Sequence, residues 1–385
     1  MEKVLLIPDS FKGTMSSIEI CTIMEERIRN YAPKIDIVSI PVADGGEGSV
    51  DTFLTAVGGE KIVLTVKGPF MENMESFYGL IDDGKTAIIE MAACAGLPLV
   101  EGNLKPELTT TYGVGQMMAD AVARGCSKII VGLGGSATND FGTGAASALG
   151  IRFYDKKGND FIPTGGTLSD VTRIDKTNMT SLAGVEVIAM CDVDTPLYGK
   201  MGAAYVFAPQ KGADLKMVKF LDDQLRKISI AIQTELGVNV SALPGAGAAG
   251  GMGGGMVAFF NAQLQMGIET VLDAVHFDQL LLNTDLILTG EGKLDSQSLR
   301  GKVVVGVARR AKKKRVPVVA LVGDIDDGIE TIYDEGISAI FSINRLAIPY
   351  EQAKLRSHRD LYLTMDNLMR FMKLSLFSEC EKSRS

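Results

Sequence analysis

Two widely separated parts of the chain share one rhythm, in which short apolar runs alternate with amphipathic segments, and this rhythm restricts the fold more than any other feature. Near the start, Val4–Ile7 predicts a buried strand, and Ile20, Met24 and Ile28 at every fourth position predict a helix. The last third repeats the pattern, with strand-like runs at 285–289, 316–322 and 339–343 and a helix candidate at 302–311. Strands that alternate with helices favour a parallel sheet with helices on both faces.

The middle of the chain breaks this rhythm. The β-like runs Glu75–Ile81 and Lys85–Met91 flank Asp82-Asp83-Gly84, which is typical of a hairpin turn. Neither terminal segment holds enough strands for a large sheet of its own. We therefore predict an α/β protein in which residues 1–65 and 285–385 form one discontinuous domain, and residues 66–284 form a second, inserted α/β domain.

Charge and cysteine usage exclude several classes of protein. Lysine and arginine number 39 against 47 aspartate and glutamate residues, a net charge of −8, which disfavours a nucleic-acid binder. The basic run at 309–315 is interpreted as the solvated end of a helix. No apolar run approaches the roughly 18 residues of a membrane span, and Val4–Ile7 is too short for a signal-peptide core. Five scattered cysteines without a C-x-x-C pair indicate reduced thiols, so we expect a cytoplasmic protein.

One glycine-rich turn has the pattern of an anion-binding loop. Lys128–Val131 predicts a strand and Ala145–Leu149 predicts a helix, with Gly132-Leu-Gly-Gly-Ser-Ala-Thr-Asn-Asp140 between them. Backbone N–H groups and the N-terminus of a helix hold phosphate in this arrangement. A tight turn capped by a hydroxyl side chain is the alternative. The candidate phosphate-binding residues are Gly134, Gly135, Ser136, Thr138 and Asn139.

Two further segments match phosphate-binding patterns formally. Gly79–Thr86 fits G-x-x-x-x-G-K-[ST], but a strand-like run follows it, so a hairpin turn is the better interpretation. Gly245-Ala-Gly-Ala-Ala-Gly250 fits the dinucleotide pattern G-x-G-x-x-G without a preceding strand. This second segment is either a flexible linker or a close backbone approach to a ligand, ahead of a helix that begins just after it. Its candidate residues are Gly245, Gly247, Gly250 and Gly251.

Several carboxylates follow predicted strands, at the edge where ligands of open α/β sheets bind. Single aspartates in such places are usually turn residues, but several that converge favour Mg²⁺ binding and proton transfer. They are Asp9, Asp44, Asp192, Asp194, Glu291 and Asp295. Lys12 and Lys211 each stand beside a glycine and are either anion-binding groups or solvated loop lysines.

Eight ordered motifs make the chain resemble the two-domain bacterial glycerate kinase family. They cover nearly the whole chain and are PDSFKG (8–13), PVADGGEGSVD (41–51), TTTYGVG (109–115), GLGGSATND (132–140), CDVDTPLYG (191–199), APQKGA (208–213), PGAGAAGGMGGG (244–255) and GEGKLDSQSLRGK (290–302). The resemblance implies ATP- and Mg²⁺-dependent phosphorylation of D-glycerate, usually to 2-phosphoglycerate. It also implies a Rossmann-like domain with an inserted domain and an active site between them.

The resemblance also implies roles for the candidate residues. We expect Asp192 to act as the general base or as a Mg²⁺ ligand, and Asp295 to be a second metal ligand and catalytic group. Lys12, with Ser10, Asp44 and Glu47, is the candidate for binding glycerate, and the two glycine-rich loops are assigned to the ATP phosphates.

The chain departs from the family's usual pattern at three places, where Phe141 replaces glycine, Thr195 replaces asparagine, and Cys94-Ala95 replaces Ala-Ser. The first two departures leave the fine choice of substrate open. A nicotinamide-dependent oxidoreductase of a small hydroxy acid and a non-catalytic sensor of a small ligand are the alternatives. The sequence does not fix the oligomeric state.

Overall fold

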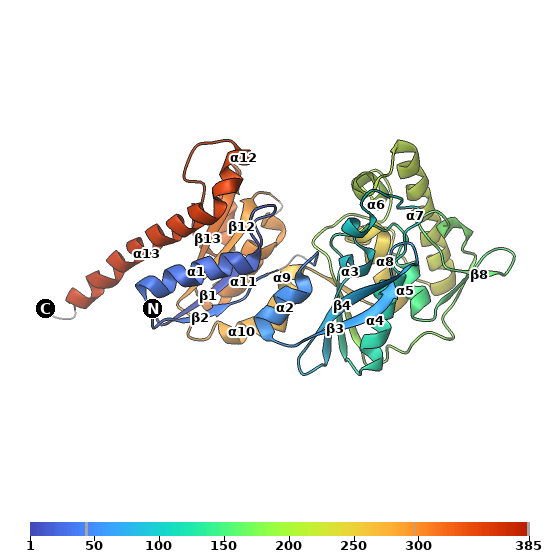
Figure 1. Ribbon diagram of the computed structural model, residues 1–385, viewed down its shortest axis with the longest axis horizontal. Coiled ribbons are helices and arrows are strands. Elements are labelled where there is room, and N and C mark those ends of the chain that lie inside the picture. The colour runs from blue at the N-terminus through green and yellow to red at the C-terminus, as the bar shows by residue number, and fades with distance from the viewer. Residues whose placement is uncertain (43–44, 297, 383–385) are drawn as a thin grey trace. The chain divides into compact units, whose positions relative to one another are not determined.

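Strands from both ends of the chain pair in one parallel sheet (Figure 1). The structure, a computed structural model, describes residues 1–42, 45–296 and 298–382 and divides into two compact units, Met1–Ala43 with Ile268–Ser385, and Asp44–Gly267. The first unit holds the five-stranded sheet in the order β14-β13-β12-β1-β2, with all neighbours parallel. Its strands are β1 (Lys3–Pro8), β2 (Asp36–Ser39), β12 (Leu286–Leu294), β13 (Val318–Ile325) and β14 (Ile337–Ser342).

Helices cover both faces of this sheet, as the sequence predicts. Val4 and Leu6 of β1 pack in one apolar cluster with Leu361 of α13, and α1 lies against α13 on this face (Figure 1). Leu5 and Ile7 point to the opposite face, where they are fully buried and where α11 contacts β1. The helices are α1 (Ser17–Tyr31), α9 (Gly267–Ala274), α10 (Phe277–Leu280), η4 (Ser298–Arg300), α11 (Val303–Lys314), η5 (Glu330–Glu335), α12 (Tyr350–Ala353), η6 (Lys354–Arg356) and α13 (Ser357–Lys382).

The sequence explains where α1 begins and α11 ends. Ser16 caps α1 through a capping box with Glu19, in which each side chain accepts a hydrogen bond from the other residue's backbone N–H. The basic run at 309–315 forms the last turns of α11 and its cap, which confirms its interpretation as a helix end. Arg309 pairs with Glu335 across the surface.

The second unit is built on a six-stranded sheet in the order β11-β10-β6-β5-β4-β3. The first four strands are parallel, and β4 and β3 run antiparallel at one edge. The predicted hairpin is confirmed, because β4 and β5 pair around a turn in which Asp82 and Asp83 have positive φ. The strands are β3 (Glu60–Lys67), β4 (Asn73–Ile81), β5 (Thr86–Glu90), β6 (Lys128–Gly132), β10 (Glu186–Met190) and β11 (Gln263–Gln265), with β7 (Arg152–Tyr154), β8 (Asp160–Phe161) and β9 (Arg173–Asp175) in a small separate sheet.

The limits of the two units differ from the expected domain limits. Residues 44–65 belong to the second unit, because β3 pairs with β4 along its whole length, from Glu60 opposite Leu80 to Lys67 opposite Asn73. Residues 268–284 belong to the first unit, where the Lys3 ammonium donates to a backbone carbonyl of α10. The hairpin marked the inserted sheet in the sequence, but its edge strand β3 carried no signal that we recognised.

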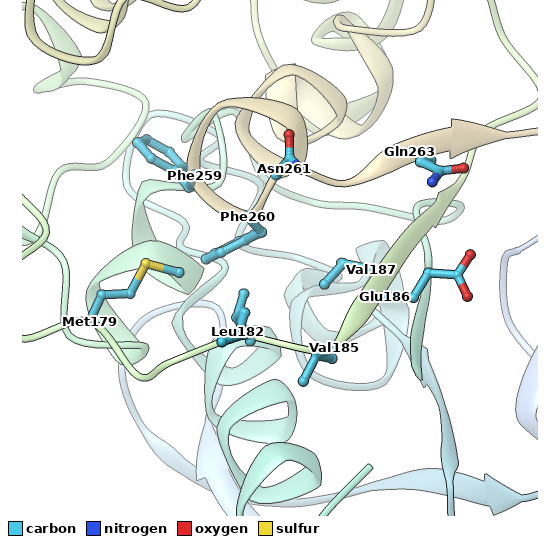
Figure 2. Close-up of a pocket in the computed structure, with 10 residues that line it drawn as sticks. Met179, Leu182, Val185, Glu186, Val187, Phe259, Phe260, Asn261 and Gln263 are labelled. Carbon is cyan, nitrogen blue, oxygen red and sulfur yellow. The ribbon is translucent and has the colours of Figure 1, made fainter. Parts of the chain in front are cut away.

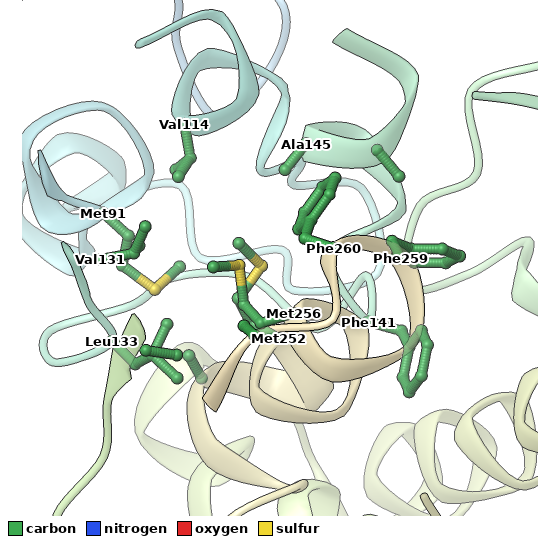
Figure 3. Close-up of a cluster of buried hydrophobic side chains, with 14 of the residues drawn as sticks. Met91, Val114, Val131, Leu133, Phe141, Ala145, Met252, Met256, Phe259 and Phe260 are labelled. Atoms are coloured by element: carbon green, nitrogen blue, oxygen red, sulfur yellow. The ribbon is translucent and has the colours of Figure 1, made fainter. Parts of the chain in front are cut away.

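A large apolar core fills the second unit (Figure 3). Met252 and Met256 of α8 face strand residues such as Val131, and the Phe259 ring packs edge-to-face on Phe141 with centroids 5.8 Å apart. Every residue from Ala248 to Met256 is buried. The glycine- and alanine-rich run is therefore packed and is not a linker. The helices are α2 (Ser49–Val57), α3 (Ala92–Ala95), η1 (Leu97–Val100), α4 (Tyr112–Ala123), α5 (Thr143–Ala148), η2 (Leu168–Asp170), α6 (Ala203–Phe207), η3 (Pro209–Lys211), α7 (Leu215–Leu236) and α8 (Ala248–Phe260).

Among the helices of the described ranges, none combines the length and the apolar character that a bilayer span requires.

Candidate active site

Two loops singled out in the sequence leave the same edge of the second unit's sheet. Glu90, Gly132 and Met190 stand opposite one another at the carboxyl ends of β5, β6 and β10, which are parallel neighbours. The β6 loop (133–139) and the β10 loop (191–196) therefore begin side by side. Ligands of open α/β sheets bind beyond this edge.

A third segment, the glycine segment (Gly245–Gly251), interlocks with both loops. The Phe141 N–H donates to the Gly250 carbonyl over 3.2 Å, and the Gly247 N–H donates to a carbonyl of the β10 loop over 2.9 Å. Gly250 has φ +66°, and a Cβ there would lie 2.1 Å from the Thr138 carbonyl oxygen. Only glycine satisfies both the backbone conformation and this contact. The predicted phosphate-binding segments thus lie together, next to the loop that carries Asp192.

The predicted use of the α5 N-terminus is wrong. The buried Asp140 carboxylate accepts hydrogen bonds from the N–H groups of Gly142 and Gly144 at the start of α5, and from the N–H and hydroxyl of Thr111 before α4. Burial raises the pKa of Asp140, and these four donors oppose the rise. Because this carboxylate already occupies the first-turn amides, they are not available to a phosphate, and the β6 loop itself is the remaining candidate.

Lys211, for which the sequence left two interpretations, is neither solvated nor exposed to a ligand. Its side chain lies in η3 with only 2% exposure. The ammonium donates to the Ser136 hydroxyl over 2.8 Å and to the Thr138 carbonyl over 2.6 Å, so it lies behind the β6 loop. Burial lowers the pKa of Lys211 to about 7, although the nearby Asp140 charge acts in the opposite direction.

The β6 loop also contains polar atoms without partners. The Thr138 hydroxyl and both polar atoms of the Asn139 side chain are buried and make no hydrogen bond within the described residues. Buried polar groups are nearly always satisfied, by protein, water or ligand. A loop with free donors, backed by a buried lysine, fits the phosphates of a nucleotide.

The segment 45–48 packs on the β6 loop. The Gly134 N–H donates to the Gly45 carbonyl over 3.0 Å, and a Cβ on Gly135, where φ is +71°, would lie 3.8 Å from a carboxylate oxygen of the exposed Glu47. The predicted residue Glu47 therefore lies beside the predicted phosphate loop. Asp44, its partner in the prediction, lies outside the described residues.

Sequence reasoning missed Glu90, which positions this segment. Its buried carboxylate accepts the N–H groups of Gly48 and Val50 at the start of α2. Burial raises the pKa of Glu90, against the lowering effect of these two bonds. A glutamate at the end of an otherwise apolar strand was the signal that could have identified it.

Asp192 follows β10 and is half-buried, and its carboxylate accepts the Gly267 N–H over 2.8 Å. Within the described ranges, no three His, Cys, Asp or Glu side chains are grouped to hold a metal ion. Mg²⁺ usually takes one or two carboxylates and completes its shell with water and substrate phosphates. A single carboxylate beside the candidate phosphate-binding loop fits that mode of Mg²⁺ binding.

The first unit gathers the other predicted residues at its own ligand-binding edge. Its strand order corresponds to the doubly wound order 2-1-3-4-5, in which the order of the strands reverses between β1 and β12 while all strands stay parallel. Asp9, Ser10 and Lys12 follow β1, and the Asp9 N–H donates to the Gly290 carbonyl of β12 over 2.8 Å. Asp295 follows β12, so these residues border the switch point.

β12 is longer than predicted, which places Glu291 inside the strand. This carboxyl group is 5% exposed, and one of its oxygens has no partner within the described residues. Burial raises the pKa of Glu291 to about 7; the charges of Asp9 and Asp295 add to the rise, while Ser298 and Lys302 oppose it. The sequence places Glu291 among the strand-end carboxylates, but Asp295 is the residue expected from it to be the metal ligand and catalytic group.

Lys12 borders a pocket of about 230 Å³ at the same edge of the first unit. Asp324, Asn344 and Tyr350 line it with Lys12, so the pocket is large enough for a small hydroxy acid and offers it both charge and hydrogen bonds. The Ser10 hydroxyl lies 3.4 Å from an Asp9 carboxylate oxygen, directly before this pocket in the chain.

A different pocket lies at the opposite, amino end of the second unit's strands (Figure 2). It measures about 380 Å³ and is lined mainly by apolar side chains, including Leu182, Val187 and Phe260. Glu186 and Gln263, which begin β10 and β11, mark its rim. Of the predicted site residues that the structure describes, none borders it.

The alternative dinucleotide interpretation lacks its strand. In the structure, residues 241–244 lie in turns directly before the glycine segment, and β10 and β11 lie elsewhere in the chain. A Rossmann fingerprint requires a strand that leads straight into the glycine turn. The glycine segment therefore serves the β6 and β10 loops and not a nicotinamide site.

The chain is similar to known proteins over nearly its whole length. A family model described as the glycerate kinase family matches residues 4–373. A glycerate kinase of Bacillus cereus is 43% identical over 375 residues, which cover 97% of this chain and 98% of that protein. A glycerate 2-kinase of Escherichia coli K12 is 41% identical over 343 residues, which cover 89% and 90%.

A crystal structure from Salmonella typhimurium LT2 carries the name glycerate kinase 2 and superposes on this chain with a TM-score of 0.86. The two sequences are 39% identical, and the match covers 97% of this chain and 99% of the Salmonella chain. These findings confirm the resemblance inferred from the eight motifs and the α/β fold class. The chain belongs to the glycerate kinase family.

Proposed function

We propose that this chain transfers the terminal phosphoryl group of ATP to D-glycerate and produces ADP and 2-phosphoglycerate. Family membership supports the kinase reaction, and the name of the Escherichia coli relative supports the 2-hydroxyl as acceptor. The observation that carries the proposal is the interlocking of the β6 loop, the glycine segment and the β10 loop at one sheet edge, with unpartnered polar atoms in the first of them.

The β6 loop and the glycine segment are proposed to hold the ATP phosphates. Phosphoryl transfer requires little covalent chemistry from the protein, because positioning and charge stabilisation supply most of the catalysis. The side chains of Ser136, Thr138 and Asn139 and the amide of Gly135 offer donors for this purpose. Gly134, whose N–H is bonded to the Gly45 carbonyl, lets the segment 45–48 approach the loop closely. Gly245, Gly247, Gly250 and Gly251 keep the surrounding backbone close enough to support these donors.

Carboxylates of both units take the metal and proton roles in this proposal. Bound Mg²⁺ would supply positive charge to the phosphates; Asp192 is the first candidate to hold it and Asp295 the second. Asp192 is equally suited to accept the proton that the glycerate hydroxyl loses, and the proposal keeps both roles for it. Glu291 lies beside Asp295 at the switch point of the first unit and adds a further carboxyl group there.

Lys12 is the proposed partner of the glycerate carboxylate. Its ammonium suits a small carboxylate as a point charge, and it borders the pocket of the first unit. Ser10, Asp44 and Glu47 are the proposed partners of the glycerate hydroxyl groups. The reduced state of Cys21, Cys94, Cys126 and Cys191 agrees with action in the cytoplasm.

A coupled assay of ADP release tests the proposal. We expect ADP release that depends on D-glycerate, ATP and Mg²⁺, and a phosphorus NMR spectrum of the product that matches 2-phosphoglycerate. Binding of glycerate without ADP release would instead support the sensor, and enhanced NADH fluorescence on mixing would support the oxidoreductase. A 3-phosphoglycerate signal would correct the acceptor position and leave the kinase reaction standing.

Replacement of Asp192 by asparagine tests its place in the reaction. The asparagine carbonyl can still accept the Gly267 N–H, so the variant should fold, while kcat should fall by about 10²–10⁴-fold. Asp223→Asn, an exposed position of α7 that pairs with Lys227, is the matched control. Near-normal turnover of Asp192→Asn would remove Asp192 from the mechanism.

A further inference from the structure

The position of Lys211 is unusual for a lysine. Lysine is rarely fully buried without a carboxylate partner, because removal of its charge from water is costly. Here the side chain is 2% exposed, and its ammonium donates to two uncharged oxygens, the Ser136 hydroxyl and the Thr138 carbonyl. Both acceptors belong to the β6 loop, which the proposed function assigns to the ATP phosphates.

The nearest acidic group does not pair with this ammonium. Asp140 directs its carboxylate to Gly142, Gly144 and Thr111, so the backbone at the starts of α5 and α4 takes up much of its charge. The protonated form of Lys211 therefore places its positive charge directly behind the β6 loop, and because burial opposes this form, an anion bound to the loop would favour it. A polyphosphate on the outer side of the loop is the natural counter-ion for a charge in this position.

The same lysine fixes the shape of the loop. Its two hydrogen bonds hold residues 136 and 138, on either side of Ala137, and the glycine segment closes on Thr138 from another direction. The unpartnered side-chain atoms of Thr138 and Asn139 lie in the part of the loop so constrained. Since Lys211 is covered by the loop, it acts on a ligand through the loop and through its charge, without touching the ligand.

We propose that Lys211 is a positioning residue for nucleotide binding, which holds the β6 loop in its phosphate-binding shape and places a positive charge behind it. This inference rests on the proposed function and replaces the two roles that the sequence left open for Lys211, direct anion binding and a solvated loop position, with an indirect one. It predicts that loss of Lys211 weakens the binding of ATP selectively and leaves the binding of glycerate nearly unchanged.

Steady-state kinetics of Lys211→Met test the inference. Methionine preserves much of the side-chain length and removes the charge and both hydrogen bonds, so KM for ATP should rise about 10-fold or more. KM for D-glycerate should stay within about twofold. Lys211→Arg keeps the charge and should recover part of the ATP affinity, and Lys219→Met, an exposed position on α7, is the matched control.

The outcomes separate this inference from the proposed function. A wild-type enzyme that releases no ADP with D-glycerate would overturn the proposed function and the inference together. Normal wild-type turnover with an unchanged KM for ATP in a folded Lys211→Met would overturn the inference alone, as would equal rises in both KM values. If circular dichroism shows that Lys211→Met does not fold, Lys211→Gln carries the test, because glutamine removes the charge and keeps a hydrogen-bond donor. A higher KM for ATP with an unchanged KM for D-glycerate then supports the inference, and an unchanged KM for ATP overturns it.

Discussion

Phe141 combines a strained backbone with a fully buried ring. At this position we expect the glycine variant to be more stable than the alanine variant, which is the reverse of the usual order. Its φ is +56°, a left-handed conformation that costs a residue with a side chain about 1–2 kcal/mol. Its ring is 0% exposed and packs against Phe259, and loss of such a ring usually costs about 3–5 kcal/mol. Phe141→Ala loses the ring and keeps the strain, whereas Phe141→Gly loses the ring and relieves the strain.

We therefore expect Phe141→Ala to lower the free energy of unfolding by about 3–5 kcal/mol and Phe141→Gly by about 2–3 kcal/mol. Urea titration followed by far-UV circular dichroism measures both values, since the chain contains no tryptophan to report fluorescence. Phe259 provides the control, because it lies in the regular part of α8, where glycine should be about 1 kcal/mol less stable than alanine. A Phe141→Gly protein that is less stable than Phe141→Ala would refute the assignment of strain.

Two further predictions concern stability. Burial raises the pKa of Glu291 from 4.5 to about 7, so the stabilising contribution of its protonated form is complete below pH 4.5 and is lost as the pH rises to 7. Glu291→Gln stays neutral, so between pH 4 and pH 8 its free energy of unfolding should gain up to about 3 kcal/mol relative to wild type. Metal-free urea titrations measure this difference, and parallel pH profiles of the two proteins would contradict the prediction. Gly250→Ala should destabilise the protein by clearly more than Gly84→Ala, because both have positive φ but only at Gly250 would the Cβ meet a backbone oxygen, at 2.1 Å; equal urea midpoints would show that the loop can yield.

Local patterns in the sequence predicted much of the fold. The spacing of Ile20, Met24 and Ile28 identified α1, and the Asp82-Asp83-Gly84 turn identified the hairpin, because both signals come from neighbouring residues. The domain limits expected from the sequence differ from those of the two units, because β3 gains its partner strand only through the hairpin that follows it. β12 was predicted too short, because Gly290 and Gly292 resemble a turn in the sequence, whereas they pack closely against neighbouring backbone.

The candidate site was predicted less completely than the fold. The glycine-rich loops and Asp192 were chosen from the sequence because their residue types are typical of anion and metal binding, and Asp192 and the β6 loop also follow predicted strands. Lys211 was noted as an anion-binding or a solvated lysine, but its burial was not predicted, since that burial depends on a loop more than seventy residues earlier in the chain. The role of Asp140 was likewise hidden, because a carboxylate that satisfies helix amides has the same sequence pattern as one that leaves them to a phosphate.

The central position of β1 has a consequence for how the chain is made. Val4 in β1 is hydrogen-bonded in register with Leu286 in β12, while all of residues 44–267 lie between them in the sequence. On the ribosome, the second unit is synthesised in full before β12 exists, and domains generally fold as they emerge. The first forty residues must therefore wait with one edge of their strand unpaired, and closure of that sheet is a late, long-range step of biosynthesis.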